Sequence, residues 1–187
     1  MKKIKHILSI ADLTTKEVWE IFFLAKKLKK EKSKKYLDGK SLALIFEKQS
    51  LRTRVSFEIG MAQLGGYVVY LDPSDTGIGV RESEEDIARV LSSMADVIAA
   101  RTYSHQTIVN IAKASTIPVI NALSDLEHPC QALADLFTIR EIKGRIEGLK
   151  IAYVGDGENN VAHSLVLGTT MLGGTFACGS PKGYWMS

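Results

Sequence analysis

The chain has 187 residues, of which 45% are hydrophobic and 24% charged, and its formal net charge is +3. This length allows one ordinary core and part of a second, and the composition is typical of a globular protein that folds without disulfide bonds. No run reaches the ~20 apolar residues of a membrane span, and the N-terminus has no apolar signal core, so we expect a cytoplasmic protein without a membrane partner.

The basic residues and the cysteines argue against nucleic-acid binding and against a metal or redox motif built on cysteines. The excess of positive charge comes from a lysine cluster between Lys26 and Lys40, on the exposed face and end of an expected helix. We therefore expect no nucleic-acid partner. Cys130 and Cys178 are single thiols without metal or redox spacing, which favours reduced cysteines in a reducing compartment.

The first third of the chain predicts a helix, a strand and a second helix. Thr14-Thr-Lys-Glu17 is a capping box that opens the first helix. Residues 42–46 are a continuous apolar run, typical of a strand buried on both faces. A helical pattern from Val55 then ends at Gly65-Gly66. The apolar stripe of the first helix consists of Val18, Ile21, Phe22, Ala25 and Leu28.

The turn between this strand and the second helix has the composition of an anion site. It contains Ser50, Arg52, Thr53 and Arg54. Free N–H groups and the dipole at a helix start favour negative charge, and a guanidinium can bind two phosphate oxygens at once. Basic residues also occur at ordinary solvated helix starts, which is the alternative interpretation.

Strands and helices alternate through the next part of the chain. We expect strands at 67–71, 96–100 and 118–121 and helices at 106–114 and 129–143. A further helix after Ser83 has an apolar stripe at Ile87, Val90, Leu91 and Met94, and a loop rich in Gly and Pro spans 72–83. This order predicts an α/β fold, a parallel sheet flanked by helices on both faces.

A second α/β unit begins after a hinge expected at 144–148. Its strands are predicted at 149–154 and 175–178, with a glycine turn at 155–160 and a helix at 161–172 between them. We therefore divide the chain into a first domain at 1–146 and the start of a second, Rossmann-like domain at 147–187. Two strands and one helix cannot bury their own faces, so this second domain is expected to be incomplete.

Polar side chains follow the predicted strands at their carboxyl ends, where α/β sheets bind ligands. They are Ser50, Arg52, Thr53, Arg101, His128, Gln131, Asn159 and Asn160. His128 and Gln131 share one face of a first helical turn. Simpler interpretations are a histidine satisfied by backbone, an Arg101 paired with a surface carboxylate, and a Gly-Asp-Gly turn without the third glycine of a nucleotide site. Cys130 adjoins His128 but does not face it, which disfavours a thiol nucleophile.

Ordered motifs along nearly the whole chain resemble those of the carbamoyltransferases. They are Ser50-Leu-Arg-Thr-Arg54, Glu82-Ser83 with Asp86 and Ala88-Arg-Val-Leu91, Arg101, His128-Pro-Cys-Gln131 and Gly155-Asp-Gly-Glu-Asn-Asn160. The Asn-Asn pair after the glycine turn resembles the ornithine branch of the family, since the aspartate branch typically has a His-Ser-Arg segment there.

The resemblance implies transfer of a carbamoyl group from carbamoyl phosphate to the δ-amine of L-ornithine, giving L-citrulline and phosphate in arginine metabolism, without cofactor or metal. Ser50, Arg52, Thr53 and the backbone of Leu51 would bind the phosphate, and Arg101 the phosphate and the carbamoyl oxygen. His128 would bind the carbonyl oxygen and Gln131 the carbamoyl nitrogen. The catalytic residues implied are Arg52, Thr53, Arg101 and His128. Asn160 would hold the amino-acid end of ornithine, with Asn159 an alternative because Glu158 lengthens the turn.

The resemblance also implies a homotrimer or a multiple of trimers, with the 72–83 loop reaching a neighbouring subunit's site. Some family members have a glutamine in this loop that contacts the phosphate. This sequence has Gly77 near that position, and Arg81 is a candidate to make the contact instead. Family members are much longer and carry an Asp, a Ser-Met-Gly loop and a His-Cys-Leu-Pro segment that this sequence lacks. We therefore expect a fragment that is nearly inactive alone, with an exposed apolar stripe on its first helix. Alternatives are an aspartate or putrescine carbamoyltransferase, or a non-catalytic carbamoyl-phosphate-binding module.

Overall fold

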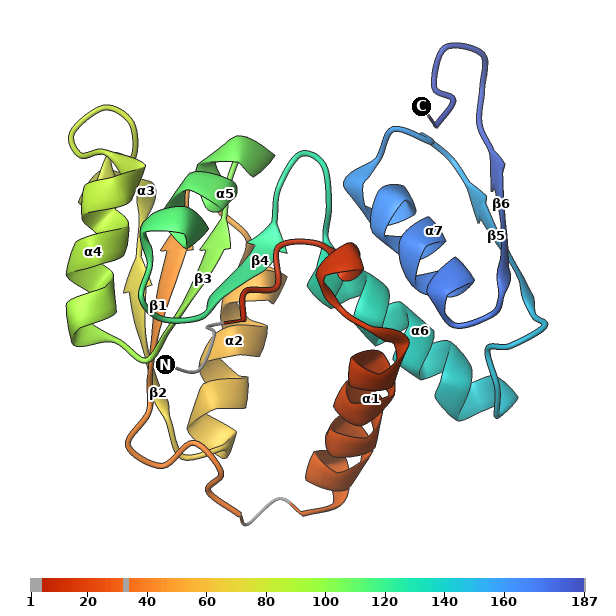
Figure 1. The fold of residues 1–187 in the computed structure, drawn as a ribbon, viewed down its shortest axis with the longest axis horizontal. Coiled ribbons are helices and arrows are strands. Elements are labelled where there is room, and N and C mark those ends of the chain that lie inside the picture. The colour runs from red at the N-terminus through yellow and green to blue at the C-terminus, as the bar shows by residue number, and fades with distance from the viewer. Residues whose placement is uncertain (1–4, 32–33, 187) are drawn as a thin grey trace.

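A four-stranded parallel sheet organises the first part of the chain in the computed structural model, which describes residues 5–31 and 34–186 (Figure 1). The strand order is β2-β1-β3-β4, and every pairing is parallel. The strands are β1 (Ser41–Phe46), β2 (Tyr67–Leu71), β3 (Val97–Arg101) and β4 (Val119–Leu123). All four carboxyl ends therefore lie at one edge of the sheet.

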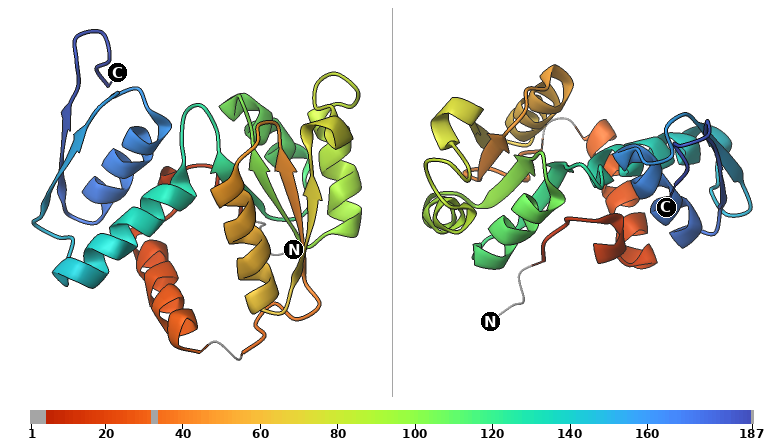
Figure 2. Two further views of the ribbon diagram at one scale, coloured as in Figure 1. Left: turned by 180° about the vertical axis from the view of Figure 1, so that it is seen from behind. Right: turned by 90° about the horizontal axis from the view of Figure 1, so that it is seen from above.

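Two helical layers cover the two faces of this sheet, as Figure 2 shows from behind and from above. Alternate side chains of a strand point to opposite faces. Ala43 and Ile45 of β1 pack with α4 (Glu84–Met94) and α5 (His105–Ala114), whereas Leu42, Leu44 and Phe46 pack with α2 (Leu51–Gln63). Every residue of β1 is buried. The predicted α/β fold with helices on both faces is confirmed.

A further hydrophobic cluster joins the two parts of the chain. It combines η1 (Ile10–Asp12), α1 (Thr15–Lys30), α6 (Pro129–Lys143) and α7 (Asn160–Met171). A methyl group at Gly168 of α7 would lie only 2.5 Å from Leu136 Cδ1 of α6, so glycine permits this close packing. Ile146, inside the segment predicted as a hinge, is fully buried in the same cluster.

The second unit contains the two-stranded parallel sheet of β5 (Lys150–Val154) and β6 (Thr175–Gly179). Ile151, Tyr153 and Phe176 face the cluster that contains α7. The opposite face is open, and Val154 on it is 86% exposed. In this structure one helix and two strands thus leave one sheet face uncovered. No helix in residues 5–31 and 34–186 combines the length and the apolar character needed to cross a membrane.

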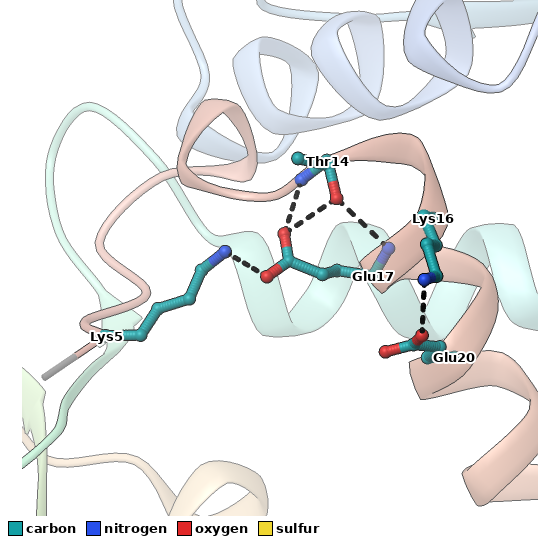
Figure 3. Close-up of polar contacts among 5 residues, drawn as sticks. All are labelled: Lys5, Thr14, Lys16, Glu17 and Glu20. Atoms are coloured by element: carbon teal, nitrogen blue, oxygen red, sulfur yellow. Dashed lines mark hydrogen bonds and ion pairs between the residues drawn. The ribbon is translucent and has the colours of Figure 1, made fainter. Parts of the chain in front are cut away.

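Helix α1 begins with the predicted capping box, drawn in Figure 3. Thr14 Oγ1 accepts the N–H of Glu17 at 3.3 Å, and the Glu17 carboxylate accepts the N–H of Thr14 at 2.8 Å and also binds Lys5. The expected exposure of the apolar stripe is wrong in part. Val18 and Phe22 of the stripe are buried against the cluster of α6 and α7, and its other members are half-buried. The exposed large apolar side chains of α1 lie outside the predicted stripe; they are Trp19, Phe23 and Leu24.

Three further predictions differ from the structure. The second helix begins at Leu51, because the Ser50 hydroxyl caps it there. The 72–83 loop contains a short helix, α3 (Pro73–Thr76), which starts with a proline in its first position and with the N–H of Ser74 bound by Asp72. On α4, Val90 and Met94 are exposed, and the buried residues are Ile87 and Ala88, so the apolar stripe is narrower than predicted.

The capping box yields a stability prediction. Thr14→Ala removes the side-chain acceptor of an orphan N–H and should lower the free energy of unfolding by about 1 kcal/mol. Lys16→Ala is the control, because the Lys16–Glu20 ion pair in Figure 3 is long, at 3.9 Å, and highly exposed. It should change stability by less than about 0.5 kcal/mol. Urea titrations of both variants measure the difference, and equal losses would contradict the capping role.

Candidate active site

A cavity of about 470 Å³ lies at the carboxyl edge of the first sheet, between the starts of α2 and α6. Its walls come from the ends of β3 and β4 and from the two helices. The lining residues are Ser50, Arg52, Thr53, Ser56, Phe57, Arg101, Ala122, Leu123, His128, Cys130, Gln131 and Ala134. The structure therefore brings Ser50, Arg52 and Thr53 of the anion turn together with Arg101, His128 and Gln131, whereas Arg54 of the same turn does not line the cavity.

The start of α2 presents hydrogen-bond donors to this cavity. Ser50 is the N-cap, and its hydroxyl accepts the N–H of Thr53 at 3.4 Å and donates to Thr53 Oγ1 at 3.0 Å. The N–H groups of Leu51 and Arg52, the first two helical residues, have no acceptor within the helix. The Leu51 side chain is 78% exposed, so the backbone is the part of Leu51 suited to binding. The first turn contains no acidic residue, which preserves its attraction for an anion.

Arg101 stands at the end of β3, where the register to β4 shifts. Its Nε is buried and has no hydrogen-bond partner among the described residues, and no ion pair to it occurs there. Burial lowers the pKa of the Arg101 guanidinium from its usual value. The simpler interpretation of a surface ion pair is therefore wrong for Arg101. A buried guanidinium nitrogen without a partner is suited to bind an anion.

His128 occupies the N-cap position of α6. Its Nδ1 is buried and has no partner in the described part of the chain. Burial, together with the positive charges of Arg101 and Lys48, lowers the pKa of the imidazole to about 4. The ring is therefore neutral at pH 7, with one nitrogen as donor and the other as acceptor. The simpler interpretation, in which the backbone hydrogen-bonds the ring of His128, therefore does not hold for Nδ1 in the described part of the chain.

The two remaining polar residues of the α6 start differ in their roles. Gln131 is exposed at the cavity, and its Nε2 donates to Asp135 Oδ1 at 2.9 Å. Cys130 Sγ donates to the carbonyl oxygen of Asn121 at 3.5 Å, and burial raises the pKa of the thiol to about 11. A thiol that stays protonated at neutral pH is a poor nucleophile, which agrees with the sequence interpretation.

Besides Leu51, four predicted candidates do not line the cavity. Gly77 and Arg81 lie in the segment between α3 and α4. Asn159 caps α7 by accepting the N–H of Val161 at 2.9 Å, and the amide of Asn160 donates to the carbonyl oxygen of Ser124 at 2.6 Å. Both asparagines thus sit at the junction between the second unit and the loop that precedes His128.

Sequence reasoning missed Lys48, Ser56 and Phe57. Ser56 lies one turn after Thr53 on the same face of α2, a spacing that could have identified it. The charge of Lys48 acts on His128, and its Nζ lies 5.3 Å from the centre of the Tyr103 ring. Lys48 lies only two residues before Ser50 of the anion turn, and this proximity in sequence could have identified it as a charge near the site. No cluster of three His, Cys, Asp or Glu side chains suited to a metal occurs in residues 5–31 and 34–186.

Comparison with known families identifies the class of protein. Residues 5–141 match the family model described as aspartate/ornithine carbamoyltransferase, carbamoyl-P binding domain. Residues 147–187 match the model of the Asp/Orn binding domain of the same enzymes. By family, the class is a carbamoyltransferase. The chain belongs to the aspartate/ornithine carbamoyltransferase family.

Individual relatives include proteins of both branches. The chain is 50% identical over 180 residues to an ornithine carbamoyltransferase of Bacillus subtilis (strain 168), covering 96% of this chain and 56% of that protein. It resembles the solved ornithine carbamoyltransferase from Pyrococcus furiosus with a TM-score of 0.95 and 48% identity, over 98% of this chain and 59% of the other. The chain also resembles the catalytic subunit of M. Jannaschii aspartate transcarbamoylase, with a TM-score of 0.87 and 36% identity, over 98% of this chain and 63% of the other. The chain thus spans less than two thirds of these relatives.

The neutral state of His128 is directly testable. The imidazole should titrate near pH 4 in an NMR pH series, and His128→Asn assigns its signal among the four histidines. An unfolded chain protonates a histidine near pH 6.5, whereas the folded chain resists protonation until about pH 4, so this residue should reduce stability as the pH falls through that window. A midpoint near 6.5 in the folded chain would contradict the buried, cation-flanked site.

Proposed function

We propose that the cavity binds carbamoyl phosphate. The phosphate lies at the α2 start on Ser50, Arg52, Thr53 and the N–H of Leu51, and the carbamoyl group lies toward Arg101, His128 and Gln131. One observation carries the proposal: Arg101 and His128 both line the cavity that the α2 start opens into, and Arg101 Nε and His128 Nδ1 are buried with no partner among residues 5–31 and 34–186. A ligand with an anionic phosphate at one end and a planar carbamoyl group with polar oxygen and nitrogen atoms at the other satisfies both ends of this site.

The reaction follows from the charges. A deprotonated amine attacks the carbamoyl carbon, and a C–N bond forms while the carbonyl oxygen gains negative charge. Arg101, Thr53 and His128 stabilise that oxygen, and one such preorganised donor contributes roughly 3 kcal/mol. The carbonyl then re-forms as the bond from carbon to the phosphate oxygen breaks, and the surplus proton of the amine passes to the departing phosphate. Holding amine and carbamoyl carbon together contributes roughly 7 kcal/mol or more.

The amine acceptor in this proposal is the δ-amine of L-ornithine, which gives L-citrulline in arginine metabolism. The names of the Bacillus and Pyrococcus relatives support it, and so does the Asn159-Asn160 pair at the junction of the two units. The proposal divides the chain into a first domain at 1–146 and the start of an ornithine domain at 147–187. It also includes a trimer, in which the loop with Gly77 and Arg81 reaches the active site of a neighbouring subunit, and a cytoplasmic location.

Aspartate is the second candidate acceptor. The 36% identity to the M. Jannaschii catalytic subunit supports it, but the higher identity to relatives named for ornithine favours ornithine. Putrescine is a third candidate acceptor, and binding of carbamoyl phosphate without any transfer is a non-catalytic candidate function. An assay with each amine in turn separates the three acceptors.

Binding is tested by calorimetric titration of carbamoyl phosphate. Arg52→Ala removes a charged donor from the cavity and should weaken binding by about tenfold to a hundredfold. Arg54→Ala is the matched control, because Arg54 lies two residues later but pairs with Glu58 at 2.9 Å and does not line the cavity. It should change affinity by less than about threefold, since its charge acts only from a distance. Equal effects of the two variants would contradict the phosphate assignment.

Turnover by the 187-residue chain is a separate question. The resemblance implies that ornithine is positioned by Ser-Met-Gly and His-Cys-Leu-Pro segments, which do not occur in these 187 residues. We expect the chain to bind carbamoyl phosphate yet form citrulline at least about a hundredfold more slowly than the Bacillus subtilis relative. A rate within about tenfold of that relative, measured at saturating ornithine, would show that the positioning groups absent from this sequence are not needed.

A further inference from the structure

The loop that leads into His128 is held by side chains of the second unit. This loop, residues 124–128, connects β4 to α6. Three residues of α7 contact its backbone: the Asn160 amide donates to the Ser124 carbonyl at 2.6 Å, the His163 ring lies 3.0 Å from the Leu126 carbonyl oxygen, and Ser164 Oγ accepts the N–H of His128 at 2.9 Å.

The contact to Ser164 continues into a buried carboxylate. Ser164 Oγ donates to Glu127 Oε2 at 3.0 Å, and the same oxygen accepts the N–H of Ile10 at 3.1 Å. Ser164 and Glu127 are both buried, and no ion pair to Glu127 occurs in residues 5–31 and 34–186. Since a serine hydroxyl has one proton, donation to the carboxylate leaves the oxygen's lone pairs for the His128 N–H. The direction of the chain of hydrogen bonds is therefore fixed.

The hydrogen bonds from His128 through Ser164 to Glu127 hold a residue whose side chain has few other contacts of this kind. His128 makes no side-chain cap of α6, and the next residue, Pro129, has no N–H. The Nδ1 atom of the His128 ring has no partner in the described residues. The carbonyl oxygen of His128 is tied to α6, because it accepts the N–H groups of Gln131 at 3.1 Å and of Ala132 at 3.2 Å. On the other side of the imidazole, the N–H of His128 is held by Ser164.

We propose that Ser164, fixed by Glu127, is a positioning residue that sets the place of the His128 imidazole in the anion cavity. This inference rests on the carbamoyl phosphate site proposed above. It makes the site depend on α7, because movement of α7 relative to the 124–128 loop changes the position of the imidazole. The amine-binding candidates Asn159 and Asn160 begin the same helix, so acceptor binding and imidazole placement are coupled through α7.

The test compares two variants that each remove one buried hydroxyl from α7. Ser164→Ala removes the anchor of His128. Thr169→Val is the control, because Thr169 Oγ1 is buried without a partner in the described residues and valine has the same shape. The first readout is the His128 imidazole pKa by NMR in the chain without added ligand, and the second is affinity for carbamoyl phosphate by calorimetry. Ser164→Ala should raise the pKa toward its ordinary value and lower the affinity by about tenfold, whereas Thr169→Val should alter neither.

Two further variants keep the inference falsifiable. Glu127→Gln retains an oxygen acceptor for Ser164 and Ile10 and should resemble the unaltered chain, whereas Glu127→Ala should resemble Ser164→Ala. If Ser164→Ala does not fold, Ser164→Cys serves in its place, since a thiol is a weak acceptor. An unchanged imidazole pKa in a folded Ser164 variant overturns the inference. If the unaltered chain binds no carbamoyl phosphate, the proposed function fails, but the imidazole titration still decides whether Ser164 positions His128.

Discussion

The parallel pairing of β1 with β3 determines the geometry of the whole site. It places Phe46, the last residue of β1, beside Arg101, the last residue of β3. The chain beyond both strands remains tied, because the Glu47 N–H donates to the Arg101 carbonyl at 2.9 Å and the Glu47 carboxylate accepts the N–H of Tyr103 at 2.7 Å. The α2 start and the Arg101 guanidinium are therefore held at one cavity by the pairing of the strands and by the two hydrogen bonds of Glu47, one from its backbone and one to its side chain.

Positive charge at this edge of the sheet is arranged for a ligand. Arg52 and Arg101 line the cavity, Lys48 acts on it from nearby, and the α2 dipole adds a partial positive charge. Like charges held together in a partly buried space repel, and burial raises the cost. The pKa of His128 is lowered first by burial and further by the charges of Arg101 and Lys48, so the ring stays neutral. A bound dianion relieves this repulsion, which links the electrostatics of the cavity to the proposed phosphate.

Much of the fold follows from local sequence patterns. The continuous apolar run of β1 and the capping box at Thr14 are short-range signals, and both have the predicted structure. The grouping of Ser50, Arg52, Thr53, Arg101, His128 and Gln131 was also predictable, because parallel strands bring their carboxyl ends together. The predicted apolar stripe of α4 was too wide. A helix at the edge of a layer buries only part of its apolar face, which leaves Val90 and Met94 exposed.

Other features depend on contacts between distant residues and had no local signal. The bond from Ser164 to Glu127 spans 37 residues, and the bond from Ile10 to Glu127 spans 117. Glu127 is buried and has no ion pair within the described part of the chain, and no local composition or periodicity predicts such a carboxylate. The partial cover of the α1 stripe by α6 is of the same kind, because it depends on how two helices separated in sequence pack together.

If the α2 start and His128 form one anion site, both must respond to the same ligand, and an amide NMR titration measures this. The ¹⁵N-labelled chain is titrated with carbamoyl phosphate while all backbone amide signals are followed. We predict that the amides of Leu51, Arg52 and His128 shift together along one saturable curve, while those of the lysine cluster between Lys26 and Lys40 change little. Shifts confined to the lysine cluster, with the α2 start unaffected, would contradict a single anion site.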